Sequence, residues 1–402
     1  MDVKDSRLMF WDGTRETVSS SVEYDGRRYV PAFFHDSLLK QLTLPTCSCA
    51  YGSTPELFGG ICKLFLSFGG LDYKCSSLAT RIVLCSHLSE VLSVAPKLLI
   101  TGLDAARANR LMTLLRCMCR HSLFLTGVTP SGFRSLPSRG NFTFLIAQPA
   151  IGDKLWNLLD QTSHRDQKIP FRGALLDLFG VQAIYDQSCV SSISRPLSCV
   201  HIPLIPTGQR LPVFDLNAQQ RIKSEFQSKL LSYRRANIGL AQTLQFDASG
   251  LSFGLQQLAC NLAAATPDDS DLQAEVLDLL ADEDKEFRSG SWVDPNVVAV
   301  EAVLVGCLRE PGGIAYVSEL AQIAEEILKR RDAEAAMDPS SFGKLLLDLG
   351  FKTRRNAKGS NLVLTESTRE LAQRLARELG APEPSDDERD HYRREISPPI
   401  GV

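Results

Sequence analysis

The residues best placed to do chemistry lie at a turn between an apolar strand and a helix. The run at 98–100, Leu-Leu-Ile, is typical of a buried strand, and helical spacing of apolar residues begins shortly after it. A helix N-terminus presents free N–H groups and a positive dipole end, which suits a phosphate. A phosphate-binding loop has the pattern G-x-x-x-x-G-K-[ST]. Gly102 supplies the first glycine, but Arg107, Ala108 and Asn109 replace the second glycine, the lysine and the hydroxyl residue.

A second apolar strand, at 141–149, shows a matching loss. A nucleotide-hydrolysing site would end this strand in acidic residues that hold Mg²⁺ and orient water. Here the strand ends in Ala147 and Gln148. Losing the lysine and the acids together predicts loss of Mg²⁺-dependent hydrolysis, so the chain is expected not to be an enzyme. Arg107 and Arg110 could supply positive charge in their place, although neither is spaced like the loop lysine.

Basic residues near the carboxyl end form a second candidate site. No acidic residue occurs between Gly350 and Leu364. A positively charged hairpin of this kind can follow the phosphates of DNA. The alternative is a protein-interaction module with a solvated basic loop. The candidate DNA-binding residues are Lys344, Lys352, Arg354, Arg355 and Lys358, with Ser340 and Ser341 on the preceding helix as further contacts.

The elements that must position these residues fall into several parts. Strands alternating with helices over 95–206 predict an α/β fold with a parallel sheet. Residues 217–280 have a helical pattern, and 293–380 have three helices followed by a hairpin, the order of a winged helix-turn-helix. The expected parts are 1–94 (an amino-terminal β-hairpin and helical region), 95–210 (the α/β core), 211–290 (a helical, lid-like block), 291–380 (the winged helix) and 381–402 (a disordered tail).

Local signals mark several element ends. Asp12-Gly13 and Asp25-Gly26 are hairpin turns. A short helix is expected between Phe33 and Leu44, and another helix over 76–94. Three further helix starts are predicted from capping residues and Pro near the first turn. These starts are the sequence Ser53-Thr54-Pro55-Glu56, the pair Asp294-Pro295, and Ser318.

Composition limits the classes of function. The 402 residues are 44% hydrophobic and 23% charged with a net charge of −3, so no global basic field draws the protein to nucleic acid. The 11 cysteines include no C-x-x-C pair, and Cys117, Cys119 and His121 are interpreted as packing residues rather than metal ligands. No apolar run reaches about 18 residues, and no signal-peptide pattern is seen. A cytoplasmic location without membrane partners is expected.

The order of segments resembles the AAA+ or superfamily-three helicase-like ATPases of plasmid, phage and integrative-element replication proteins, which are often paired with a primase. LTLPTCSCAYGSTPELFGGI is similar to the segment before their nucleotide fold, and LLITGLDAARANRLMTLLRCMCRH to their phosphate-loop helix. NFTFLIAQ, FRGALLDLFGVQAIYD and SISRPLSCVHIPL are similar to their later strands. The resemblance covers about residues 30–375. It implies a P-loop NTPase-like, AAA+-like core with a lid-like block and a winged helix, and it gives Arg195 the role of arginine finger or sensor.

Three hypotheses follow from these observations. The first is a non-catalytic pseudo-ATPase that acts with DNA in the replication or regulation of a mobile genetic element, without a cofactor. The second is an active DNA-stimulated ATPase or helicase, in which Arg107, Arg110 and Arg195 contact the phosphates of ATP-Mg²⁺. The third is a protein-interaction adaptor without DNA binding. The expected partners are DNA and replication proteins, and the resemblance allows an oligomer.

Overall fold

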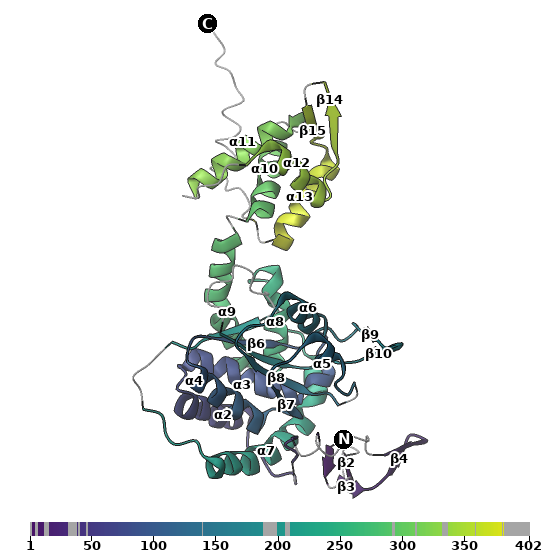
Figure 1. Ribbon diagram of the computed structural model, residues 1–402, viewed down its shortest axis with the longest axis vertical. Helices are drawn as coiled ribbons and strands as arrows, with labels where there is room; N and C mark the ends of the chain where they lie inside the picture. Colours follow the sequence, from purple (N-terminus) through teal and green to yellow (C-terminus); the bar gives the residue numbers. More distant parts are fainter. Residues whose placement is uncertain are drawn as a thin grey trace. The chain divides into compact units, whose positions relative to one another are not determined.

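The chain divides into two compact units, each described by itself below. Unit 1 comprises Met1–Ala248 and Gln257–Leu279, and unit 2 comprises Ser249–Gln256 and Leu280–Val402. Figure 1 shows the computed structural model. The structure describes residues 2–4, 7–11, 16–30, 38, 41–45, 47–138, 140–187, 199–205, 210–291, 294–309, 312–331, 337–357, 359–379 and 381.

Unit 1 is built around a five-stranded sheet in which every neighbouring pair is parallel, which confirms the predicted α/β class. The strand order is β12-β6-β11-β8-β7, so β6 lies inside the sheet although it is the first of these five strands in sequence. All five residues of β6 are buried, as expected for a strand covered on both faces. The strands are β6 (Lys97–Thr101), β7 (Ser122–Leu125), β8 (Thr143–Gln148), β11 (Gln182–Asp186) and β12 (Cys199–Pro203).

Helices cover both faces of this sheet (Figure 1). Phe133 of α5 and Leu155 of α6 pack with Leu99, Phe144 and Ile184 in one core cluster, which places α5 and α6 on a single face. Helix α4 packs against α2 and α7. The residues of two later helices, α8 (Phe253–Ala263) and α9 (Ser270–Ser291), are divided between the two units. The helices that belong to unit 1 alone are α2 (Thr54–Gly69), α3 (Tyr73–His87), α4 (Ala105–Met118), α5 (Pro130–Arg134), α6 (Asp153–Gln161) and α7 (Leu216–Thr243).

Two helix starts in unit 1 show how closely capping residues predict structure. Helix α2 begins with the expected capping box, in which Ser53 and Glu56 each accept a hydrogen bond from the other's backbone N–H. The helix expected over 76–94 is wrong at both ends. Asp72 is the N-cap of α3, and its side chain accepts a hydrogen bond from the N–H of Cys75 at 2.7 Å. The helix therefore begins at Tyr73, and it ends at His87. A separate 3-10 turn, η1, then covers Ser89–Val91.

The amino-terminal strands form small antiparallel sheets. They are β1 (Asp2–Lys4), β2 (Arg7–Trp11) and β3 (Glu16–Ser19) in one sheet, and β4 (Val22–Tyr24) and β5 (Arg27–Tyr29) in another. The second pair turns at Asp25-Gly26, as predicted, with φ of 52° and 68°. Another hairpin, β9 (Ile169–Phe171) with β10 (Ala174–Leu176), precedes β11. The Asp12-Gly13 turn and most of the helix expected over 33–44 lie outside the described residues.

Unit 2 contains a three-stranded antiparallel sheet of order β13-β15-β14. Its own core joins Val303 of α10, Leu320 of α11, Phe342 of α12 and Leu362 of β15. Helix α11 begins at Val317 with Tyr316 as the N-cap, so the predicted cap at Ser318 is wrong. The elements are α10 (Pro295–Arg309), β13 (Ile314–Tyr316), α11 (Val317–Arg330), α12 (Pro339–Asp348), β14 (Thr353–Asn356), β15 (Gly359–Val363) and α13 (Glu366–Leu379).

Candidate functional site

The turn after β6 is shaped by a close approach of two backbone segments. Gly102 has φ of 129°, a conformation that side chains disfavour. A Cβ there would lie 2.6 Å from the carbonyl oxygen of Leu204, just beyond β12. The hydroxyl of Tyr185 donates to the carbonyl of Gly102 at 3.0 Å. The glycine therefore has a packing role at this position.

The N-terminus of α4, where a phosphate would bind, is capped by the chain's own carboxylate. Asp104 accepts a hydrogen bond from the backbone N–H of Arg107 at 2.9 Å. A carboxylate at this end of a helix is favoured by the dipole, and it uses one of the free N–H donors. A phosphate would have to displace Asp104 and overcome its negative charge.

The guanidinium of Arg107 is hydrogen-bonded to backbone carbonyl oxygens. It donates to the carbonyl oxygens of Gly69 at 3.1 Å and Ile205 at 2.7 Å, and also to Gly70. It thereby ties the turn between α2 and α3, and the segment after β12, to the start of α4. Arg110 donates to the Pro212 carbonyl. The two arginines proposed as phosphate ligands in the active-enzyme hypothesis are thus occupied by carbonyl oxygens.

The remaining loop and strand-end positions have structural surroundings. Ala108 is fully buried, and Asn109 is exposed. At the end of β8, Ala147 is 7% exposed. The Gln148 side chain accepts from the N–H of Val128 at 2.9 Å and donates to the carbonyl of Ala150 at 3.1 Å. Gln148 therefore joins the loops after β7 and β8. Arg195 lies outside the described residues.

Polar residues that sequence reasoning missed also meet at this carboxyl edge of the sheet. Asp186, at the end of β11, is 2% exposed and is aligned with Thr101 and Gln148 of the neighbouring strands. Thr101 Oγ1 lies 2.8 Å from Nε2 of His201. An apolar strand that ends in an acid, VQAIYD, is the signal that could have identified Asp186.

The electrostatics of this edge are unfavourable for an anion. Burial, followed by the charges of Asp104 and Asp186, raises the pKa of Tyr185 above its ordinary value. Within the described ranges, no group of three or more His, Cys, Asp or Glu side chains could hold a metal ion.

The cysteines at the end of α4 are protonated near neutral pH, because burial raises the pKa of Cys117 to about 11 and that of Cys119 to about 12.

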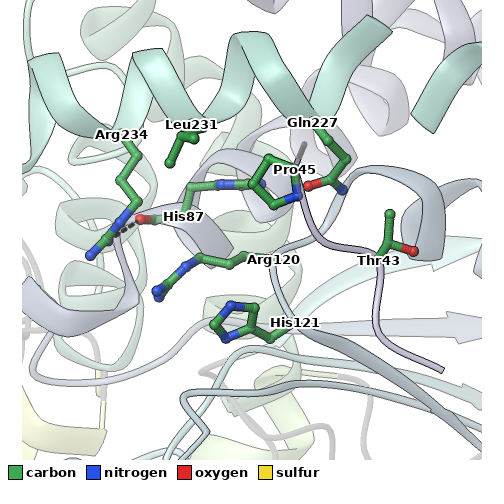
Figure 2. Close-up of a pocket in the computed structure, with 8 residues that line it drawn as sticks. All are labelled: Thr43, Pro45, His87, Arg120, His121, Gln227, Leu231 and Arg234. Carbon is green, nitrogen blue, oxygen red and sulfur yellow. Dashed lines mark hydrogen bonds between the residues drawn. The ribbon is translucent and has the colours of Figure 1, made fainter. Parts of the chain in front are cut away.

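A small cavity lies in unit 1 beside two arginines and two histidines (Figure 2). Its volume is about 10 Å³, enough for roughly one water molecule. Arg120 and Arg234 both bind Glu90, at 2.5 and 2.7 Å, and Arg234 also donates to the carbonyl of His87. These ion pairs connect η1 to α7 and to the segment before β7. The cavity is too small for an organic ligand.

The basic residues of unit 2 have very different surroundings. Lys344, Lys352, Arg354 and Arg355 are all exposed, and none has an ion pair within the part of the chain that the structure describes. Arg354 and Arg355 are neighbours on β14, an edge strand, opposite Asn361 and Ser360 of β15. Consecutive strand residues point to opposite faces. Lys358, at the hairpin turn, lies outside the described residues.

The exposed side of α12 offers less than the sequence indicated. Ser341 donates its hydroxyl to the N-cap Asp338 at 3.2 Å, and its N–H binds the same carboxylate at 3.0 Å. Leu347 is 55% exposed, and Asp348 next to it is acidic. The backbone N–H of Ser340 also contacts the Asp338 carboxylate, whereas the exposed Lys344 has no ion pair to a described residue.

Comparison with known proteins gives no family. No protein-family model matches the chain, and no curated protein matches it in sequence. The solved structures similar to it include the apo A form of the NrS-1 C-terminal region, with 12% identity and a TM-score of 0.38 over 86% of this chain and 82% of that chain. Another is Drosophila ORC bound to DNA, with 11% identity and a TM-score of 0.19 over 89% of this chain and 96% of that chain. TM-scores of this size support no inference about function.

Among the described helices, none combines the length and the hydropathy needed to cross a bilayer.

Proposed function

We propose that this protein is a non-catalytic DNA-associated factor that binds DNA through the basic hairpin of unit 2. The observation that carries the proposal is the exposure of Lys344, Lys352, Arg354 and Arg355, without an ion pair among the described residues. Exposed cations that are not neutralised within the protein remain available to phosphates, and binding releases the counterions of DNA.

The arrangement of unit 2 supports a winged helix-turn-helix. The order α10-β13-α11-α12-β14-β15 places three helices before a hairpin. In this assignment β14 and β15 form the wing, and α12 is the helix directed at a groove. Because Arg354 and Arg355 point to opposite faces of one edge strand, the wing can contact phosphates on two sides.

The contacts of the loop after β6 support the absence of catalysis. The α4 terminus is capped by Asp104, Arg107 is bound to carbonyl groups, and Ala108 offers no amine. An active ATPase would require Arg107 to leave those carbonyls and Asp104 to leave its N–H partner. The α/β unit is therefore proposed to be a scaffold. A role in the replication or regulation of a mobile genetic element, together with replication proteins, rests on the resemblance of the segments alone.

DNA binding is tested by titrating the full chain with a duplex oligonucleotide at several salt concentrations. The slope of log K against log salt should fall by about 1.8 in Arg354→Ala/Arg355→Ala, since each phosphate contact contributes about 0.9. The matched control is Arg374→Ala/Arg377→Ala, which removes two exposed arginines from α13. If the hairpin variant keeps the wild-type affinity and slope, the hairpin is not a phosphate clamp and the adaptor hypothesis is favoured.

Catalysis is tested separately, by assaying ATP hydrolysis with Mg²⁺ in the presence and absence of DNA. We expect no turnover above that of a sample in which Arg107 is replaced by Ala. Hydrolysis by the wild-type chain that is lost in Arg107→Ala and Arg110→Ala would establish the active-enzyme hypothesis instead.

A further inference from the structure

A second cavity in unit 1 lies between α5 and α6 and is lined by cationic and amide side chains. Its volume is about 250 Å³, and its lining residues are Pro130, Arg134, Lys154, Asn157, Leu158 and Gln161. No carboxylate is among them. From this cavity we infer a binding site for a phosphate group, separate from the loop after β6 and from the basic hairpin.

The local sequence explains why these side chains converge. On α6, Lys154, Asn157 and Gln161 are spaced i, i+3 and i+7, which places them on one face of the helix. The opposite face of α6 buries Leu155 and Leu159 against the sheet. The polar stripe is therefore held at a fixed distance from α5 by the hydrophobic core.

Arg134 is fixed in the same way. Thr129 caps α5 by accepting the N–H of Gly132 at 3.1 Å, and Phe133 is fully buried. The Phe133 ring lies 4.9 Å from the ring of Phe144 on β8, centroid to centroid. This anchor positions Arg134, the next residue, at the cavity wall.

Arg134 lacks the oxygen partners that three other arginines of unit 1 possess. Arg107, Arg120 and Arg234 all bind carbonyl or carboxylate oxygens. For Arg134 the structure shows no hydrogen bond or ion pair to any described residue, and its Nε is buried without an acceptor. A buried donor without an acceptor is costly, and an anion in the cavity would supply the acceptor.

The chemistry of the lining selects a phosphate group. A guanidinium, an ammonium and two amides offer donors from several directions, which suits the several acceptor oxygens of a tetrahedral oxyanion. The volume of about 250 Å³ is below the roughly 300–1,000 Å³ typical of sites for drug-sized ligands, and it accommodates a phosphate group. The group can belong to free phosphate or to a nucleic-acid backbone.

The test uses inorganic phosphate and the full chain. Calorimetric titration and thermal unfolding are measured with phosphate and with chloride at equal ionic strength. Phosphate should raise the unfolding temperature of the wild type, because a ligand that binds only the folded state stabilises it. Arg134→Gln and Lys154→Gln should each weaken phosphate binding by roughly 10- to 100-fold, the loss expected for a charge-assisted hydrogen bond.

The matched control is Lys63→Gln, which removes an exposed lysine from α2. It should keep the wild-type phosphate response. Circular dichroism establishes that each variant is folded, and Lys154 is exposed, so its replacement leaves the core intact. A wild type that does not respond to phosphate, or a response that persists in both site variants, overturns the site.

The two sources of phosphate are separated with a short oligonucleotide. Its affinity is measured for Arg354→Ala/Arg355→Ala, with and without Arg134→Gln, so the result does not depend on the basic hairpin. A further loss of affinity on adding Arg134→Gln supports a nucleic-acid phosphate at this site. Unchanged oligonucleotide affinity, together with loss of the inorganic phosphate response, supports a free phosphate or a small phosphate ester.

Discussion

The carboxyl edge of the parallel sheet and the basic hairpin of unit 2 use arginine in opposite ways. At the sheet edge, Arg107 is half-buried and donates to three carbonyl oxygens from two distant segments. On the hairpin, Arg354 is exposed and has no ion pair among the described residues. The first arrangement stabilises the fold, whereas the second leaves charge available to a partner. The number of arginines in a segment is therefore a poor guide to binding until their acceptors are known.

The contacts within the protein extend along the carboxyl edge of the sheet. The strand and helix flanking Gly102 are well packed, so the scaffold around the turn is intact. The turn itself is held by hydrogen bonds at Asp104 and Arg107, and the Gln148 side chain joins the loops after β7 and β8. At this edge the polar side chains are therefore engaged in contacts within the protein.

The largest expected effect belongs to the ion cluster at Glu90, where one carboxylate binds both Arg120 and Arg234. Burial raises its pKa, but the charges of Arg120 and Arg234 outweigh burial and lower the pKa to about 2. The pKa is below that of an unfolded glutamate, so the carboxylate stabilises the fold above about pH 4.5 and this contribution is lost as the pH falls towards 2. Glu90→Gln should lower the free energy of unfolding by about 3 kcal/mol at pH 7.

Urea unfolding of the wild type and Glu90→Gln at several pH values measures this contribution. The gap between the two proteins should shrink as the pH falls from 4.5 to 2. Lys229→Gln, which breaks an exposed i,i+4 pair with Glu225, is the control and should change stability by under about 0.5 kcal/mol. A gap that does not depend on pH would show that the charge of Glu90 is not its stabilising feature.

A direct test of the comparison replaces one arginine in each region with alanine. Arg107→Ala should destabilise unit 1 by about 2 kcal/mol, because carbonyl groups of Gly69 and Ile205 lose a charged donor. Arg354→Ala should leave stability within about 0.5 kcal/mol, because its side chain is exposed. Chemical denaturation of both variants provides the measurement. Equal effects on stability would remove the distinction between the two arginines.

The sequence predicts the architecture well where the signals are local. The apolar run of β8 and the capping residues of α2 depend on neighbours in the chain, and the structure agrees with both. The acceptors of Arg107 could not be predicted, because Gly69 and Ile205 are 38 and 98 residues away. Glu90 likewise meets Arg234 across 144 residues. Long-range partners decide which charges are free, and periodicity does not reveal them.

A smaller effect is expected at the N-cap of α4. Asp104→Ala removes the carboxylate that accepts the N–H of Arg107, and should cost about 1 kcal/mol of stability. It should not produce ATP hydrolysis, since Ala108 still lacks an amine to neutralise phosphate charge. Thermal unfolding and a hydrolysis assay test the two outcomes together. Turnover gained by this single change would mean that Asp104 alone blocks an otherwise complete site.

The smallest effect is expected when the charge of the hairpin is kept and its geometry is changed. Exposed phosphate contacts are mainly Coulombic, whereas bidentate recognition of a base or a fixed phosphate requires the fork of arginine. Arg354→Lys/Arg355→Lys should therefore bind duplex DNA within about threefold of wild type, with the same salt slope, although the alanine pair loses about 1.8 from that slope. Titrations on two unrelated sequences provide the measurement. A large loss confined to one sequence would show that these arginines read bases or a fixed geometry, and the hairpin would then be a specificity element rather than a phosphate clamp.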